Sequence, residues 1–178
     1  MNNVVDIEGG ISKRGQSWQC DGEERFRTEI RRIMVPTDLT SESDRAIELG
    51  IALAKQLGAH LTLLHVYQDP YYVLGYALGP QAGDPAPQIR RNVRHTFESL
   101  AKNVRKECPD CRCEFRDGVP FEEIVRTAKE RDIDLIVIST HPRNCFTRLV
   151  FGCDAEHIIR DAPCPVLILH AEAGGPKC

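Results

Sequence analysis

Polar residues follow a buried-strand pattern at a point where a ligand could be held. The run Leu135–Ile138 is aliphatic without polar alternation, which is typical of a strand covered on both faces. A loop from Ser139 to Phe151 follows it, and Gly152 then opens an amphipathic segment. Such strand–loop–helix units place ligands at the carboxyl end of the strand, near the helix N-terminus. The residues from Ser139 to Cys153 are therefore the first candidates for a binding site.

Asp38 is the second candidate, because it stands just beyond another buried run. Ile33, Met34 and Val35 form that run, and Pro36 ends it. Two interpretations of Asp38 stay open. Its carboxylate could contact a ligand, or it could cap a turn, as aspartates in strand-to-helix loops often do.

Cysteine chemistry is a third possibility, since three of the eight cysteines stand in the run CPDCRC at 108–113. A structural zinc site needs four ligands, and no second pair with this spacing occurs, so we expect no metal. The turn at Pro109 and Asp110 could bring the sulfurs of Cys108 and Cys111 together as a local redox pair. The alternative interpretation is a set of half-exposed free thiols.

Composition narrows the class of protein. The chain has 178 residues, of which 42% are hydrophobic, enough for one domain with tails. Its 23 basic and 26 acidic residues give a net charge of -3, which offers no electrostatic reason for nucleic-acid or membrane binding. No apolar run approaches the roughly 20 residues of a membrane helix, and the N-terminus lacks signal-peptide regions. We expect a cytoplasmic protein.

The elements that must position these residues follow from hydrophobic periodicity. Residues 1–28 show no period and are interpreted as a flexible extension, residues 68–88 as a broken loop, and residues 171–178 as a flexible tail. Thr40, Ser41 and Ser43 are candidate N-caps, and Gly58 is a candidate C-cap, for the first of four predicted helices. Alternating strands and helices predict a three-layer, doubly wound parallel sheet. The predicted strands are 33–36, 61–66, 112–116, 135–138 and 166–169, and the predicted helices are 43–57, 89–107, 120–131 and 152–161.

Three stretches resemble the universal stress protein family: RIMVPTDLT, LTLLHV and DLIVISTH…LVFGCDAEHIIRDAPCPVLIL. The resemblance covers residues 31–170, essentially the whole predicted domain. It implies an α/β, adenine-nucleotide alpha-hydrolase-like fold, with a five-stranded parallel sheet in the order 3-2-1-4-5. It also implies a homodimer formed through the last strand, here Val166–His170. One group of this family binds ATP or a related adenine nucleotide, and the other does not.

The loop after the fourth strand departs from the pattern of the nucleotide-binding group. That pattern has three glycines and then Ser or Thr, where this chain has Ser139, Pro142, Gly152 and Cys153. Glycine lets the backbone approach phosphate oxygens closely, whereas proline has no N–H and a fixed φ. A thiol is also a weaker donor than a hydroxyl. We therefore expect a damaged phosphate cradle.

The other half of the implied pocket matches the family better. Asp38 corresponds to the acidic residue near the ribose or base, preceded by Pro36 and Thr37, and Val66 corresponds to the apolar position beside the adenine. Within the loop, His141 takes the usual histidine position, and Arg143 and Arg148 could reach phosphates. Solvated loop arginines and a loop-shaping histidine are the competing interpretations. The candidate nucleotide-binding residues are Pro36, Thr37, Asp38, Val66, Ser139, His141, Pro142, Arg143, Gly152 and Cys153.

Three functions compete at this point. The first is a non-catalytic, stress-associated regulator that binds ATP or AMP weakly. The second is a homodimeric interaction module that binds no nucleotide. The third, a slow ATPase or phosphotransferase, is weakest, because no general base or metal-binding carboxylate pair can be placed beside the phosphate site.

Overall fold

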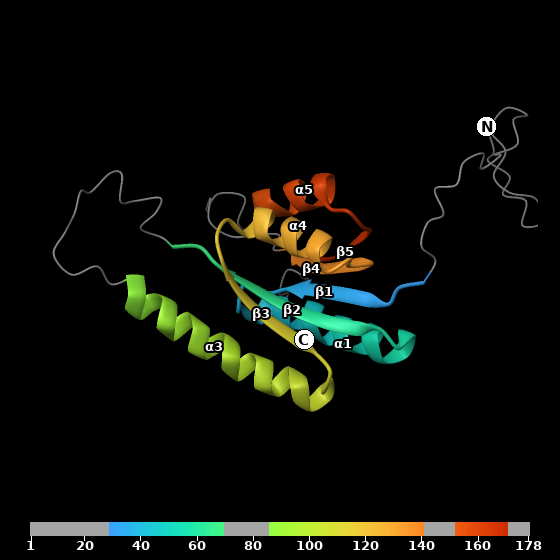
Figure 1. The fold of residues 1–178 in the computed structure, drawn as a ribbon, viewed down its shortest axis with the longest axis horizontal. Coiled ribbons are helices and arrows are strands. Elements are labelled where there is room, and N and C mark those ends of the chain that lie inside the picture. The colour runs from blue at the N-terminus through green and yellow to red at the C-terminus, as the bar shows by residue number, and fades with distance from the viewer. Residues whose placement is uncertain (1–28, 70–85, 141–151, 171–178) are drawn as a thin grey trace, which may run out of the picture.

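The sheet has five parallel strands, and its order confirms the prediction. The computed structural model describes residues 29–69, 86–140 and 152–170 (Figure 1). The strands pair in the order β3-β2-β1-β4-β5, so β3 and β5 are the two edges of the sheet. They are β1 (Arg32–Pro36), β2 (His60–Tyr67), β3 (Arg112–Asp117), β4 (Leu135–Thr140) and β5 (Val166–His170).

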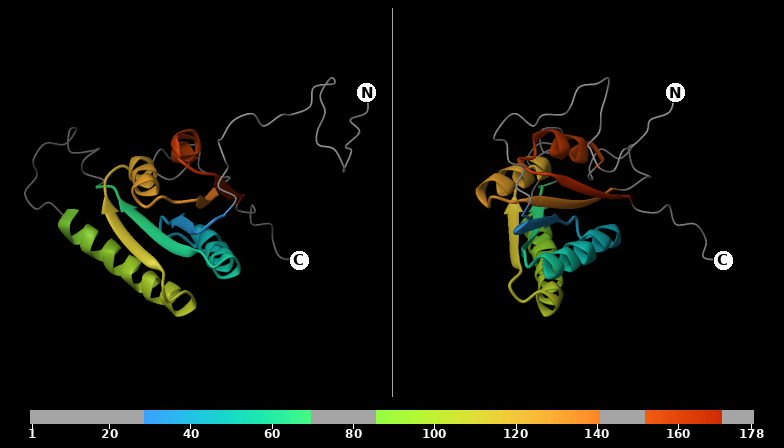
Figure 2. Two further views of the ribbon diagram at one scale, coloured as in Figure 1. Left: turned by 45° about the vertical axis from the view of Figure 1, so that its right-hand side comes forward. Right: turned by 90° about the vertical axis from the view of Figure 1, so that its right-hand side faces the viewer.

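Two helices cover each face of the sheet, which gives the predicted three layers. The helices are α1 (Ser41–Leu57), α3 (Ala86–Glu107), α4 (Pro120–Glu130) and α5 (Gly152–Asp161). Helices α1 and α3 lie on one side and α4 and α5 on the other (Figures 1 and 2). Within the described ranges, no helix combines the length and the apolarity that crossing a membrane requires.

The continuous apolar runs of the central strands follow from this layering, because successive side chains point to opposite faces and both faces are covered. Ile33 and Val35 of β1 belong to the core cluster on the side of α1 and α3. Met34, between them, belongs to the cluster on the side of α4 and α5. Strand β4 alternates in the same way, with Val137 in the first cluster and Ile136 in the second.

The ends of α1 agree only in part with the sequence analysis. Gly58 is the C-cap as predicted, with a left-handed φ of 64° and its N–H bonded to the carbonyl of Ala54. Of the three candidate N-caps, Thr40 takes the N-cap position, which confirms that candidate, although its side chain makes no capping hydrogen bond. Its hydroxyl is instead bonded to Asp38. The start of α1 is therefore organised by the preceding loop.

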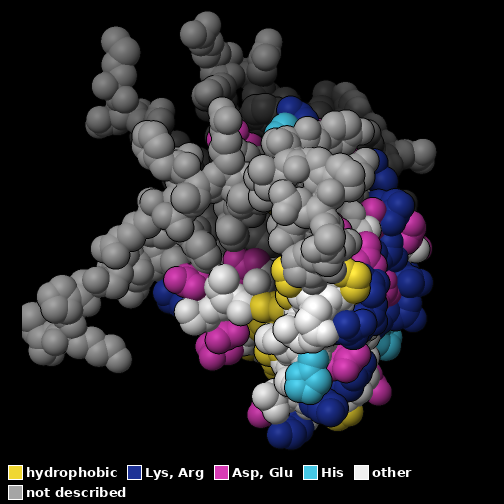
Figure 3. Space-filling view, turned by 90° about the vertical axis from the view of Figure 1, so that its left-hand side faces the viewer, with side chains coloured by type: hydrophobic (Ala, Val, Ile, Leu, Met, Phe, Trp, Pro, Cys, Tyr) yellow, Lys and Arg dark blue, Asp and Glu magenta, His cyan; other side chains and the backbone are white. Residues whose placement is uncertain are grey.

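Two helix faces differ in how they meet solvent. The amphipathic pattern predicts Ile158 and Ile159 on the same side of α5, but Ile158 is fully buried and Ile159 is 50% exposed. Successive side chains on a helix point about 100° apart, so when Ile158 points directly into the core, Ile159 lies at the border with solvent. The basic outer face of α3 carries local pairs, such as Arg90 with Asp117 at 2.6 Å. On the face of the molecule that Figure 3 shows, basic and acidic side chains are interspersed.

Candidate functional site

The loop between β1 and α1 holds the Asp38 carboxylate in one orientation. Oδ1 of Asp38 accepts a hydrogen bond from the Thr40 N–H at 3.0 Å and another from the Thr40 hydroxyl at 2.6 Å. Leu39, between them, has a φ of 65°, a left-handed conformation that is uncommon outside glycine. The turn-capping interpretation of Asp38 is therefore correct. A carboxylate has about four acceptor positions, so the two bonds from Thr40 do not by themselves exclude a ligand contact.

Thr37 shapes this loop from inside. Its side chain is buried, and its hydroxyl accepts a hydrogen bond from the Leu39 N–H at 3.1 Å and lies 2.8 Å from the Ser43 hydroxyl. Because Ser43 donates its own proton to the Thr40 carbonyl at 2.8 Å, the Thr37 hydroxyl must be the donor to Ser43. The loop hydroxyls thus satisfy one another, and the Thr37 side chain serves the loop geometry.

His65 of β2 anchors the same loop to the sheet. It is buried, it stacks on Phe97 with ring centroids 5.9 Å apart, and its Nδ1 lies 2.8 Å from the Thr37 carbonyl. Burial lowers the pKa of His65, partly opposed by this hydrogen bond and by the charge of Asp38. The imidazole is therefore neutral at pH 7 with Nδ1–H as donor. Sequence reasoning missed this role, although a histidine inside the apolar run LTLLHV was a signal for it.

A small pocket lies where the carboxyl ends of β1 and β4 meet. These strands are neighbours in the sheet, with Ile33 beside Leu135. The pocket has a volume of about 10 Å³, room for about one water molecule. Its lining residues are Pro36, Asp38, Ser43, Ile138 and Ser139. Three predicted site residues, Pro36, Asp38 and Ser139, are thereby brought together, while Ser43 and Ile138 were not predicted.

The remaining predicted residues are placed less completely. Val66 is half-buried against the core cluster on the side of α4 and does not line the small pocket. Gly152 begins α5, so the backbone of Cys153 lies in the first turn of that helix, as predicted. The predicted residues His141, Pro142 and Arg143 lie outside the described residues.

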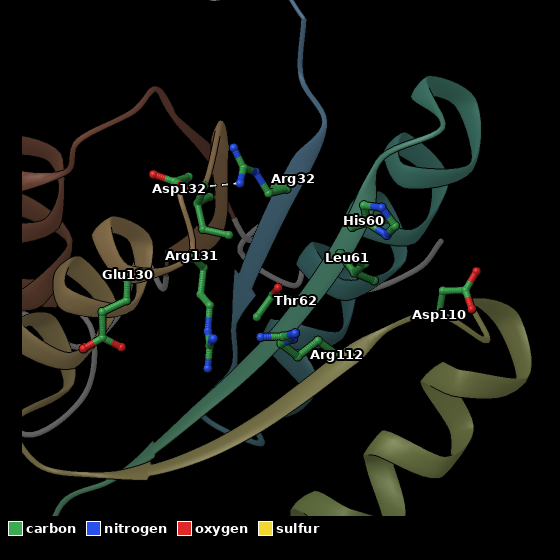
Figure 4. Close-up of a pocket in the computed structure, with 10 residues that line it drawn as sticks. Arg32, His60, Leu61, Thr62, Asp110, Arg112, Glu130, Arg131 and Asp132 are labelled. Carbon is green, nitrogen blue, oxygen red and sulfur yellow. Dashed lines mark hydrogen bonds and ion pairs between the residues drawn. The ribbon is translucent and has the colours of Figure 1, made fainter.

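A larger pocket, of about 410 Å³, lies at the opposite, amino-terminal ends of the strands (Figure 4). Its three arginines each have a carboxylate partner. Arg32 lies 3.3 Å from Asp132, and Arg131 and Arg112 lie 2.9 Å and 3.7 Å from Glu114. The charges lining this pocket are thus largely balanced within the protein.

The sequence family follows from a comparison with known proteins. The model of the Universal stress protein family matches residues 29–170, which include every strand and helix described above. The chain belongs to this family. Among the described residues of this universal stress protein, no group of three or more His, Cys, Asp or Glu side chains is arranged to hold a metal ion.

Individual relatives agree with this assignment. The universal stress protein MJ0531 of Methanocaldococcus jannaschii is 29% identical over 143 residues, which cover 78% of this chain and 81% of the relative. The solved structure of MJ0577, from the same organism, has a TM-score of 0.66 at 20% identity and covers 82% of this chain and 99% of that chain. A universal stress protein from Archaeoglobus fulgidus, solved in complex with dAMP, has a TM-score of 0.56 at 20% identity, covering 79% and 98%. These structural similarities establish the fold.

Proposed function

We propose that this universal stress protein is a non-catalytic, stress-associated regulator with a partly degenerate adenine-nucleotide pocket at the carboxyl ends of β1 and β4. The observation that carries the proposal is the Asp38 carboxylate, which Thr40 orients beside Pro36 and Ser139. An oriented carboxylate is a strong acceptor for ribose hydroxyls or adenine amino groups. The dAMP complex of the Archaeoglobus relative supports the choice of an adenine nucleotide as ligand.

The degeneracy concerns the phosphate half of the pocket. Ser139 is the fifth residue of β4, paired with Leu169 of β5, where the family pattern has a glycine. Pro142 cannot donate a backbone N–H, and Cys153 offers a weaker donor than the expected hydroxyl. Each lost charge-assisted hydrogen bond weakens binding by roughly 1.5–3 kcal/mol. ATP should therefore bind weakly, and AMP or ADP should suffer less because their phosphates depend less on this loop.

The non-catalytic assignment rests on what phosphoryl transfer requires. That reaction needs a positioned nucleophile or water and metal-bound phosphates. Asp38, the carboxylate at the small pocket, has one oxygen committed to two hydrogen bonds from Thr40. It is better placed to orient a ligand than to accept a substrate proton.

We also propose that two copies associate through β5. This strand is an edge of the sheet, and an edge strand presents unpaired N–H and C=O groups that another chain can use. Its Leu167 is a large apolar side chain that is 40% exposed. A homodimeric interaction module that binds no nucleotide is the second candidate function. The substitutions Ser139, Pro142 and Cys153 in the phosphate loop favour it.

A cytoplasmic location completes the proposal. Cys108, Cys111, Cys113 and Cys164 are all free thiols. Free thiols persist in reducing compartments, whereas oxidising ones favour disulfides.

The test of the proposed function is calorimetric titration of AMP into the protein and into Asp38→Asn. The asparagine keeps an oxygen acceptor for Thr40 but loses the charge that strengthens a bond to the ligand, so AMP affinity should fall about tenfold. Asp44→Asn makes the same change on the exposed first turn of α1 and should leave AMP affinity within about twofold. Equal AMP affinity for Asp38→Asn and the parent protein would place the ligand elsewhere, and no binding of AMP at millimolar concentration would favour the interaction module.

A further inference from the structure

The junction between α3 and β3 brings two thiols into contact. Cys111 immediately precedes β3 and is buried, and Cys113 is the second residue of the strand and half-buried. Two residues apart on extended backbone, they point to the same side, and their Sγ atoms are joined by a hydrogen bond of 3.9 Å. The Pro109–Asp110 turn favours Cys108 and Cys111 as a local pair, but the hydrogen-bonded pair is Cys111 and Cys113.

The two thiols have different electrostatic environments. The hydrogen bond from Cys111 lowers the pKa of Cys113 to about 7, with partial burial opposing this shift and the charge of Arg105 assisting it. The same hydrogen bond, together with burial, raises the pKa of Cys111. Of the two thiols, Cys113 therefore loses its proton more readily, and the Cys111 S–H can donate to the resulting thiolate. A thiolate that exists at neutral pH is the reactive form of cysteine.

We propose that Cys113 and Cys111 form a dithiol that hydroperoxides oxidise to an intrachain disulfide. The Cys113 thiolate attacks one peroxide oxygen, the O–O bond breaks, and the leaving hydroxide or alkoxide takes a proton from water. This step oxidises the sulfur by two electrons to a sulfenic acid and reduces the peroxide. The Cys111 sulfur then attacks the Cys113 sulfur, so that the S–S bond forms and the S–O bond breaks. The departing hydroxide and the thiol proton of Cys111 leave as water.

The position of the pair suits this reaction. The sulfurs must close from 3.9 Å to the disulfide length of about 2.05 Å. Cys111 lies between the Pro109–Asp110 turn and the first residue of β3, where a local shift breaks few strand contacts. Strand β3 is an edge of the sheet and pairs with β2 alone, through Cys113 beside Leu63. The site is on the edge opposite β5 and does not depend on the proposed nucleotide pocket.

Cys164 provides an internal reference for reactivity. It is half-buried like Cys113, but burial raises its pKa to about 11. At pH 7 about half of the Cys113 thiols, but only about one Cys164 thiol in ten thousand, would be ionised. The Cys113 thiolate is less basic than the Cys164 thiolate and is therefore roughly sixtyfold less nucleophilic, which offsets part of this difference. Brief iodoacetamide treatment of the full chain, read by mass spectrometry, should therefore label Cys113 on the order of a hundredfold faster than Cys164. Labelling of Cys113 at the rate of Cys164 would overturn the proposal.

The disulfide itself can be read from tryptic peptides, because trypsin cleaves after Lys106, Arg112 and Arg116 and so separates Cys111 from Cys113. After treatment with hydrogen peroxide, the peptides ECPDCR and CEFR should be recovered as one cross-linked species, with fragmentation placing the bond on Cys111. Cys113→Ser should abolish this species. Cys111→Ser should leave a sulfenic acid on Cys113 that dimedone traps, and Cys164→Ser should behave as the parent protein.

Three outcomes contradict the proposal: a bond from Cys108 in place of Cys111, oxidation of Cys111 that persists in Cys113→Ser, or no cross-linked species while both thiols remain alkylatable. Circular dichroism of each variant before oxidation shows whether it is folded. If Cys111→Ser does not fold, the comparison of Cys113→Ser with Cys164→Ser tests the proposal. Cys113 is only half-buried, so we expect Cys113→Ser to fold.

Discussion

Restoring glycine and hydroxyl residues in the loop after β4 should strengthen ATP binding by roughly tenfold to ten-thousandfold. The triple variant carries Ser139→Gly, Pro142→Gly and Cys153→Ser, which recreate the pattern of the nucleotide-binding group. One or two phosphate hydrogen bonds would be regained, each worth roughly 1.5–3 kcal/mol when charge-assisted, and about 1.4 kcal/mol corresponds to a factor of ten. The glycines also allow the backbone to approach the phosphate oxygens, and the first turn of α5 adds the positive end of its dipole.

The measurement is calorimetric titration of ATP into the parent protein and the triple variant. The same three substitutions in an Asp38→Asn background are the control, and they should regain less affinity because the ribose and base half of the pocket is then weakened. AMP affinity should change less than ATP affinity. A correctly folded triple variant that gains no affinity for ATP would show that the loop is not what limits binding.

Replacing Leu167 in β5 with aspartate should convert the proposed homodimer into monomers at micromolar concentration. A two-fold axis places the same patch on both copies, so the substitution appears twice in the dimer interface. It removes an apolar side chain from each copy and adds a negative charge to each. A loss of at least about 2 kcal/mol, or roughly thirtyfold in the dissociation constant, is expected. Sedimentation velocity of both proteins over a concentration series measures this directly.

Leu57→Asp is the matched control for this substitution. Leu57 is 46% exposed, similar to Leu167 at 40%, but it lies at the end of α1, away from β5. It should therefore leave the dimer intact. A parent protein that sediments only as a monomer, or a Leu167→Asp protein that dimerises as strongly as the parent, would contradict association through β5.

The architecture could be predicted from the sequence because its signals are local. Runs such as Ile33–Val35 and Leu135–Ile138 are apolar at successive positions, a pattern typical of a strand covered on both faces. Gly58 ends α1 as a left-handed C-cap for an equally local reason, the conformational freedom of glycine.

The candidate site was less predictable for two reasons. Some of its contacts join residues that are distant in the chain, and others depend on the side to which the backbone conformation directs a side chain. The bond from His65 to the Thr37 carbonyl connects β2 to the loop after β1, and no sequence spacing indicates it. The pair Cys111 and Cys113 shows how backbone conformation decides which side chains meet. A turn between Cys108 and Cys111 was the sequence signal, but the extended backbone from Cys111 to Cys113 aligns those two side chains. For Asp38, the sequence allowed two roles. The turn-capping hydrogen bonds are observed, and the ligand contact stays a proposal.

The central claim, an adenine-nucleotide pocket weakened in its phosphate half, is tested most directly by titrating ATP and AMP separately into the unaltered protein by calorimetry. The account predicts that ATP binds with a dissociation constant far above the low micromolar range, and that AMP binds no more weakly than ATP despite lacking two phosphates. A low micromolar dissociation constant for ATP, tighter than that for AMP, would contradict it, because the phosphate loop would then be intact in spite of Ser139, Pro142 and Cys153.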